Sequence, residues 1–322
     1  MKSISHLTDF YYNTLYPTLQ ELEEERRALK DKIVKLGIVA LVIALIILYF
    51  LTNGLKSINP DTIVFVLFAL AAGGGFIYKI MVKDYASSFK TKVIEPLIRE
   101  IDNNLRYNPT YMIEEHVFRN SKLFTNKIDR YSGNDYVTGT IDSVDISFSD
   151  VHAEQRHKDS KGRTSWSTIF KGLFIITSFN KHFSNSTIIL PDSAEGIFGS
   201  LIGNWLQSNN FTREQLVKMD DPEFEKEFVV YGSDQIEARY ILTHSMMKRI
   251  LDLKKKTGQP VYISFINGQM NLAIEYNKDL FEPSVFRSLL EYKVAMEYVK
   301  TLQLTIAIIE ELKLNQRLWS KR

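Results

Sequence analysis

Two long runs without charged residues near the N-terminus constrain this chain more than any other feature. They are Leu36–Leu55 (LGIVALVIALIILYFLTNGL) and Thr62–Tyr78 (TIVFVLFALAAGGGFIY). A helix crosses a hydrocarbon core about 30 Å thick with roughly 17–25 apolar residues. The first run is long enough, and the second is at the short end of that range. Because only residues 56–61 separate them, the sequence predicts a transmembrane helical hairpin over residues 36–78.

The lysines and arginines around this hairpin predict its orientation, because loops rich in these residues stay in the cytoplasm. The connection between the runs holds only Lys56. The outer flanks hold nine cations: Arg26, Arg27, Lys30, Lys32 and Lys35 before the hairpin, and Lys79, Lys83, Lys90 and Lys92 after it. We therefore expect a two-pass membrane protein with both termini in the cytoplasm. The first run lacks a following cleavage site of small residues, so it reads as a retained anchor.

Apolar rows on either side of the hairpin predict a helical stalk. Leu15, Leu19 and Leu22 begin a heptad stripe in which Arg26 is the polar position. A second row follows the hairpin at intervals of four: Phe89, Val93, Leu97, Ile101 and Leu105. Counted outward from the membrane, Glu23–Glu25 fall beside Lys90 and Lys92. A lead helix within 1–35 should thus pair antiparallel with a stalk helix over 79–106, although two separate surface helices are the alternative.

Residues 107–322 read as a soluble α+β domain with a mainly antiparallel sheet, flanking helices and a long C-terminal helix. Strands are expected at 144–149, 169–177, 186–190 and 228–231, and a hairpin joins 261–266 to 269–276 through Asn267-Gly268. Helices are expected over Ile197–Trp205, from Thr243 to Gly258, and over 284–316. Gly172, between bulky strand residues, indicates a close backbone approach, and Phe224 and Phe228 are assigned to the core.

The last of these helices has an apolar arc over 301–314 that is too wide for one contact surface. One interpretation is a helix packed between the sheet and the stalk. The other is a self-association surface, which would make the protein a homo-oligomer.

A polar loop predicted over Ala153–Thr168 carries the first group of candidate contact residues. It holds four cations and an aromatic side chain that could meet a partner protein or an anionic lipid headgroup: Arg156, Lys158, Lys161, Arg163 and Trp166. The alternative is a solvated hairpin tip. His152, Glu154, His157 and Asp159 lie in the same stretch, but the neighbouring cations disfavour a metal ion.

A second candidate group lies in the region that follows. Asp221, Asp234, Glu237 and Arg239 are interpreted as a partly buried structural ion-pair group. A ligand clamp is the alternative reading of the same four residues.

The remaining composition excludes several classes of function. A net charge of +2 gives no basic stripe for nucleic acid, and the absence of cysteine excludes disulfides, thiolate metal sites and cysteine nucleophiles. Gly73-Gly74-Gly75 lacks the Lys-Ser/Thr of a phosphate loop, and neither a Gly-x-Ser-x-Gly elbow nor a His-Glu-x-x-His motif occurs. We therefore predict no cofactor, and no catalytic constellation is recognised.

Four segments carry a family resemblance: FKGLF (170–174), FNKHF (179–183), DPEFEKEF (221–228) and DQIEARYILT (234–243). With the two apolar runs, the chain resembles the bacterial membrane family labelled domain of unknown function 3137. The resemblance implies a bacterial inner-membrane protein with a cytoplasmic α+β domain and no assigned catalytic residues. It also implies a LemA-type helical membrane protein as a partner, since such genes often lie beside those of family members.

These observations favour a membrane-anchored cytoplasmic interaction module, a scaffold or sensor that acts through protein–protein contacts. Two other hypotheses stay open. One is a membrane-associated enzyme acting on lipid or peptide, and the other is a domain that binds lipid or a small ligand.

Overall fold

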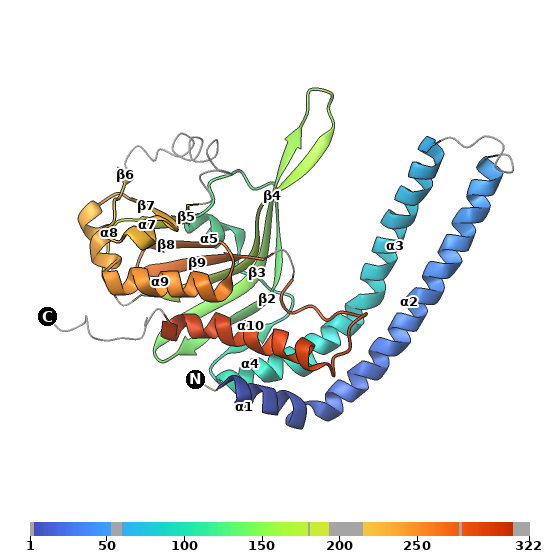
Figure 1. Ribbon diagram of the computed structural model, residues 1–322, viewed down its shortest axis with the longest axis horizontal. Coiled ribbons are helices and arrows are strands. Elements are labelled where there is room, and N and C mark those ends of the chain that lie inside the picture. Colours follow the sequence, from blue (N-terminus) through green and yellow to red (C-terminus); the bar gives the residue numbers. More distant parts are fainter. Residues whose placement is uncertain (1–2, 53–59, 180, 193–214, 277–278, 312–322) are drawn as a thin grey trace. The chain divides into compact units, whose positions relative to one another are not determined.

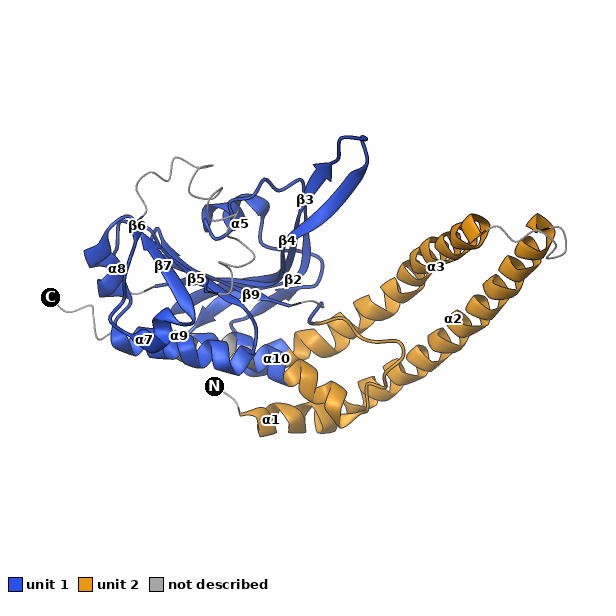
Figure 2. Ribbon diagram, turned by 45° about the horizontal axis from the view of Figure 1, so that its top comes forward, with its two compact units in different colours: residues 1, 98–280, 300–322 blue, residues 2–97, 281–299 orange. Residues whose placement is uncertain are grey.

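The computed structural model describes residues 3–52, 60–179, 181–192, 215–276 and 279–311 (Figure 1). The helix expected over Ile197–Trp205 lies outside these residues. The chain forms two compact units (Figure 2). We call residues 2–97 and 281–299 the helical unit, and residues 98–280 and 300–322 the sheet unit. Long apolar helices, an antiparallel sheet and a C-terminal helix confirm the α+β class.

The helical unit consists mainly of two long helices, α2 (Tyr16–Leu51) and α3 (Pro60–Phe89). A short helix α1 (Ile4–Asp9), capped by Ser3, and a π-helical turn η1 (Phe10–Thr14) precede α2. Pro17 lies in the first turn of α2, where its missing N–H leaves no hydrogen bond unmade. A second π-helical turn, η2 (Lys90–Ile94), and α4 (Glu95–Ile101) follow α3. Because Pro96 cannot donate a backbone hydrogen bond, the helix widens just before it.

The expected antiparallel pairing of the two stalk segments is confirmed. Lys92 Nζ lies 2.8 Å from Glu21 Oε1, which joins η2 to the start of α2. Leu19 and Leu22 on one segment and Phe89 and Val93 on the other are fully buried. The charge partners differ from those expected, however, because Lys90 pairs with Glu282 at 2.5 Å instead of with Glu23.

The final helix begins later than predicted, and residues 312–316 of the predicted span lie outside the described residues. Helix α10 spans Tyr292–Glu311, so the expectation of a helix from residue 284 is wrong. Instead, Ser284 and Ser288 side chains accept hydrogen bonds from the amides of Phe286 and Leu290, which are typical of turns. The Leu289 amide and the Val285 carbonyl bond to buried side chains of α2. These partners replace the bonds that a helix would have supplied.

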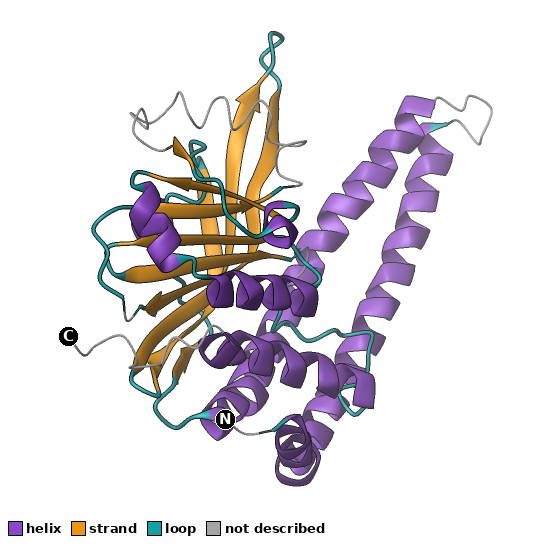
Figure 3. Cartoon of the chain, turned by 60° about the vertical axis from the view of Figure 1, so that its left-hand side comes forward, coloured by secondary structure: helices purple, strands orange, loops and turns teal. Residues whose placement is uncertain are grey.

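The described part of the sheet unit contains nine antiparallel strands (Figure 3), in the spatial order β1-β2-β3-β4-β9-β8-β5-β7-β6. Their bounds are β1 Arg106–Asn108, β2 Arg130–Ile141, β3 Val144–Lys158, β4 Thr164–Ser178, β5 Thr187–Pro191, β6 Gln215–Leu216, β7 Phe228–Gly232, β8 Val261–Ile266 and β9 Gln269–Glu275. Among the described residues, the helices that lie wholly within the sheet unit are α5 Glu115–Asn120, α7 Pro222–Glu225, α8 Gln235–Ile241 and α9 His244–Thr257.

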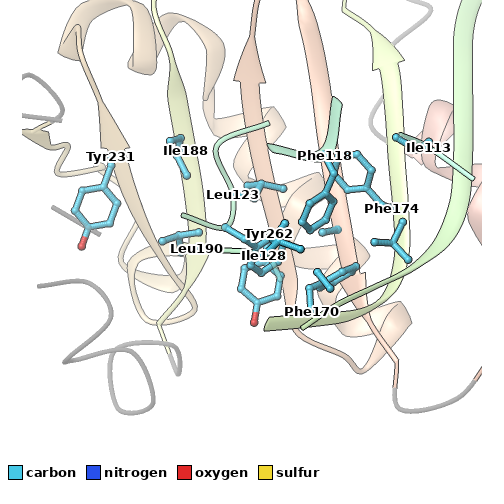
Figure 4. Close-up of a cluster of buried hydrophobic side chains, with 14 residues drawn as sticks. Ile113, Phe118, Leu123, Ile128, Phe170, Phe174, Ile188, Leu190, Tyr231 and Tyr262 are labelled. Carbon is cyan, nitrogen blue, oxygen red and sulfur yellow. The ribbon is translucent and has the colours of Figure 1, made fainter. Parts of the chain in front are cut away.

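The middle of this sheet is covered on both faces, since β5 and β8 are buried along their whole length. On one face, Phe118 of α5 and Phe124 pack on Phe170 and Phe174 of β4, with ring centroids 4.9–5.8 Å apart (Figure 4). The apolar side of α9 is also buried, through Met246, Met247, Ile250, Leu251 and Leu253. Phe224 and Phe228 are buried and stacked, as expected for core residues.

Local signals in the sequence identified several elements correctly. Asn267 and Gly268 both have positive φ (54° and 75°) and connect β8 to β9, as their pairing in a tight hairpin requires. Thr243 caps α9, and Gly258 ends it in the left-handed conformation with φ 62°.

The loop predicted over Ala153–Thr168 is mostly strand. β3 continues to Lys158 and β4 begins at Thr164, so the connection is only residues 159–163. The polar composition of this stretch reflects exposure on both faces of a strand pair, not the absence of regular structure. The expectation of a sixteen-residue loop is therefore wrong, although its position at a hairpin tip is right.

Gly172 provides a direct test of the close backbone approach inferred from sequence. A Cβ atom there would lie 2.1 Å from the Ile274 carbonyl oxygen on β9. We expect Gly172→Ala to lower the free energy of unfolding by about 3 kcal/mol through this collision. Gly258→Ala, which has only the positive φ and no atom within 4 Å, should cost about 1 kcal/mol. Chemical denaturation of the detergent-solubilised chain measures both, and equal midpoints would contradict the strand-contact argument.

Candidate functional site

The β3–β4 hairpin extends beyond the rest of the sheet as a two-stranded arm (Figure 1). The pairing of β2 with β3 stops at Arg130 and Glu154, and the pairing of β9 with β4 begins only at Gly172. Residues 155–158 and 164–167 therefore pair only with each other. We call residues 154–168 the arm.

The turn at the tip of the arm is organised by Asp159. Its carboxylate accepts hydrogen bonds from the amides of Lys161 and Arg163 at 2.9 and 2.8 Å, and from the Arg163 guanidinium at 2.9 Å. These bonds, led by the one from the Arg163 amide, lower the pKa of the Asp159 carboxyl. Gly162 adopts φ +77°, which closes the turn. The tip thus has a defined shape even though its residues are exposed.

One face of the arm combines cations with an aromatic ring. Arg156 lies directly across from Trp166 in the strand register, and Trp166 is 40% exposed. The Arg130 guanidinium lies over the Trp166 ring at 3.9 Å and also pairs with Glu154 at 3.1 Å. Such stacking holds an indole in place while leaving its outer face accessible. Arg130 is the residue of this face that sequence reasoning missed, because its proximity depends on the β2–β3 register.

The arm carries more positive charge than its own carboxylates neutralise. Arg163 pairs with Asp159 and Arg130 pairs with Glu154. Among the described residues, no carboxylate forms an ion pair with Lys158 or Lys161. Arg156 has a carboxylate beside it, because Asp129 accepts its amide at 2.9 Å and interacts electrostatically with its guanidinium. The arm therefore presents a net positive surface, which is electrostatically complementary to anionic groups.

The residues considered for a metal ion do not converge. His157 Nε2 lies 2.7 Å from Ser167 Oγ, on the face of the arm opposite to Trp166. His152 and Glu154 are 3.9 Å apart and lie at the base of the arm. Within the part of the chain that the structure describes, no three His, Asp or Glu side chains form a metal-binding group.

The second candidate group is used for local structure. Asp221 and Asp234 cap α7 and α8 by accepting two amide hydrogen bonds each. Glu237 accepts the amides of Ser184 and Asn185 at 2.7 and 2.8 Å, and Arg239 donates to the Lys218 carbonyl at 3.1 Å. The four side chains have backbone partners in place of the ion pairs among themselves that the sequence suggested. Asp221 does contact His244, at 3.2 Å.

The helical unit contains a buried ion pair between Glu23 and Arg26. The sequence indicated it only by placing Arg26 in an apolar stripe. Glu23 and Arg26 are 3% and 6% exposed, and two hydrogen bonds of 2.7 and 2.8 Å join them. Arg26 also donates to the Val285 carbonyl at 2.6 Å, and Glu23 accepts the Leu289 amide at 3.2 Å. The pair thus fastens the segment 281–291 to α2 (Figure 2).

The protonation state of Glu23 follows from these contacts. Burial by itself raises the pKa of this carboxyl, but the hydrogen bonds from Arg26, Arg27 and the Leu289 amide outweigh burial and lower the pKa to about 2. Because this pKa lies below the ordinary value of 4.5, the stabilisation is present above that pH. It is lost as the pH falls through about 2.

Comparison with known proteins supports the family resemblance seen in the sequence. Residues 168–314 match the model of a family described as a protein of unknown function, DUF3137. Over this region the chain is similar to that family. The matched region contains most of β4 and all of β5–β9, α7–α9 and α10. All four sequence segments noted above lie inside it. A comparison with curated proteins gave no match.

Among solved structures, the chain is similar to the crystal structure of the mycobacterial trehalose monomycolate transport factor A, TtfA. The TM-score is 0.32 and the sequence identity is 9%. The alignment covers 66% of this chain and 93% of that chain.

Two arginines around Glu23 allow a matched test of the buried pair. We expect Arg26→Met to lower the free energy of unfolding by about 3 kcal/mol, because it leaves the Glu23 carboxylate buried without its main partner. Arg27 contacts the same carboxylate at 3.1 Å but is 68% exposed, so Arg27→Met should cost less than about 1 kcal/mol. Thermal unfolding of the full chain in detergent measures both. Similar melting temperatures for the two variants would contradict a structural role for the buried pair.

Proposed function

We propose that this protein is a membrane-anchored interaction module. In this proposal α2 and α3 cross the cytoplasmic membrane as a hairpin, and the sheet unit lies in the cytoplasm and works through contacts with other proteins. The proposal does not include a chemical reaction. It rests first on the surface of α2 and α3, second on the flanking charges, and third on the arm.

The surface of the two long helices is the observation that carries the proposal. Both are long and apolar enough to cross a membrane. In the most apolar 18-residue stretch of each helix, only 6% and 0% of the residues are buried. Phe50, Phe65 and Phe68 are 73%, 69% and 70% exposed. A continuous apolar surface of this size is unfavourable in water and favourable in hydrocarbon. A hairpin with cations on its outer flanks then favours cytoplasmic termini.

The arm is the part of the sheet unit best suited to meet a partner. It projects from the sheet, its tip is shaped by Asp159, and two of its cations, Lys158 and Lys161, form no ion pair with a carboxylate among the described residues. We propose that it contacts an acidic surface of another protein. The family resemblance makes a LemA-type membrane protein the first partner to test, and a second copy of the chain is the next.

Membrane anchoring predicts resistance to extraction. The wild-type protein should stay in the membrane pellet after alkaline carbonate treatment, because its apolar helices have no other environment to enter. Val42→Lys and Ile46→Lys in α2 combined with Phe65→Lys and Phe68→Lys in α3 should shift most of the protein to the supernatant, since each lysine costs up to about 3 kcal/mol in the bilayer core and neither span remains intact. Leucines at the same positions serve as the control and should leave the protein in the pellet. Release of the wild-type protein by carbonate would contradict the proposal.

The arm predicts a specific cross-link. A photoreactive amino acid in place of Trp166 should form a protein adduct in intact cells. Arg156→Glu, Lys158→Glu and Lys161→Glu together should reduce that adduct about tenfold or more, because like charges would then face each other. The same change at Lys248, Lys255 and Lys256 of α9 provides a control with equal charge and should leave the adduct unchanged. An adduct with lipid alone, or one insensitive to arm charge, would contradict a protein partner at this site.

A further inference from the structure

An exposed aromatic residue lies at the boundary between the charged and apolar parts of the helical unit. Phe286 is 55% exposed, and its ring stacks on that of Tyr78 with centroids 6.4 Å and planes 5° apart. Tyr78 is the last residue of the second uncharged run and is itself 36% exposed. The pair therefore presents two rings at the end of the α3 apolar surface.

The height of this pair along the hairpin follows from the register of the stalk. Glu21 and Lys92 form an ion pair and so lie at the same level. Tyr78 comes fourteen residues before Lys92, and Lys35 comes fourteen residues after Glu21. Tyr78 and Lys35 are thus level with each other, about 21 Å along the helices from that ion pair. Both apolar runs begin or end at this level, which is where a membrane–water interface would lie.

Phe286 is held at this position by bonds on both sides of it. The preceding carbonyl, of Val285, accepts the buried Arg26 guanidinium at 2.6 Å, and the Phe286 amide donates to Ser284 Oγ at 3.2 Å. Three residues further on, the Leu289 amide donates to Glu23. The exposure of the ring is consequently set by a fixed backbone, and an apolar ring fixed in this way would be unfavourable in water.

The charges around the pair match the same location. Lys35 and Lys79 lie next to the ends of the apolar runs, where ammonium groups can reach lipid phosphates. The carboxylate that acts electrostatically on Tyr78 is Glu282, and it forms an ion pair with Lys90. Aromatic rings beside lysines are the composition that membrane interfaces favour.

We propose that Phe286 and Tyr78 insert together into the interfacial layer of the bilayer, so that the segment Pro283–Glu291 forms a membrane contact in addition to the two spans. The inference rests on the proposed membrane anchoring. It assigns a lipid surface as the partner of a segment distant from the spans in sequence. The buried Glu23–Arg26 pair positions that segment.

The absence of cysteine allows a direct test with single nitroxide labels. Phe286→Cys, Phe65→Cys and Tyr292→Cys are labelled in the full chain and reconstituted into vesicles of phosphatidylethanolamine and phosphatidylglycerol. Phe65 lies within the second apolar run. Tyr292 is 65% exposed and stacks on Tyr12, a contact of the same kind in the same unit. Collision with oxygen relative to a water-soluble nickel chelate should be about threefold or more higher at position 286 than at position 292, and highest at position 65.

The three labels separate failure of the inference from failure of the anchoring. A label at 286 that matches 292, with 65 in lipid, would overturn the interfacial contact and leave the anchoring intact. A label at 65 that reads as aqueous would overturn both.

A second measurement keeps Phe286 in place. A lipid with a photoactivatable group near the glycerol should label residues 283–291 of the unmodified chain, and Phe286→Ser should reduce that labelling several-fold. Absence of labelling in the unmodified chain would overturn the contact.

Discussion

The exposed apolar surface of α2 and α3 is the constraint on which the rest of the molecule depends. Within the described structure, the most apolar stretches of these two helices are almost wholly exposed and pack against nothing that would bury them. In the proposed arrangement lipid covers these helices, because a helix leaves no backbone group unbonded in hydrocarbon. The antiparallel register of the stalk, which the Glu21–Lys92 ion pair reports, is compatible with such a hairpin.

The Glu23–Arg26 pair fixes the position of a segment that is distant from α2 in the sequence. A buried ion pair contributes little net stability by itself, since desolvation offsets the attraction between the charges. Here both partners also bond to backbone groups of residues 285 and 289, which would otherwise be buried without partners. The pair therefore specifies where a distant segment docks. That segment places Phe286 against Tyr78. Arg26, the polar position in the apolar stripe of α2, therefore determines where the segment lies.

Sequence patterns predicted those parts of the structure that depend on neighbouring residues. Asn267-Gly268, Thr243 and Gly258 identified a hairpin and both ends of a helix, because turn and cap conformations are set locally. The spacing of Leu19, Leu22, Phe89 and Val93 identified the faces of the stalk. Gly172 indicated a close approach, and the approaching group is the Ile274 carbonyl.

The errors arose where distant contacts determine the structure. Residues 284–291 have helical periodicity, but Glu23 and Arg26 take up the backbone groups that a helix would use. The arm lacks the alternation of a half-buried strand because its strands pair beyond the sheet. In the candidate site, Arg156, Lys158, Lys161, Arg163 and Trp166 were identified as one exposed stretch. The stacking of Arg130 on Trp166 required the β2–β3 register, which no local pattern contains.

The most direct test of the central claim is the topology of the hairpin in living cells. Because the chain has no cysteine, Lys56→Cys and Trp166→Cys report on single positions in the connection between α2 and α3 and in the arm. A membrane-impermeant maleimide should label position 56 from the periplasmic side of spheroplasts and label position 166 only after the membrane is opened. Labelling of position 166 in sealed spheroplasts, or protection of position 56, would contradict a cytoplasmic module held by a two-helix membrane anchor.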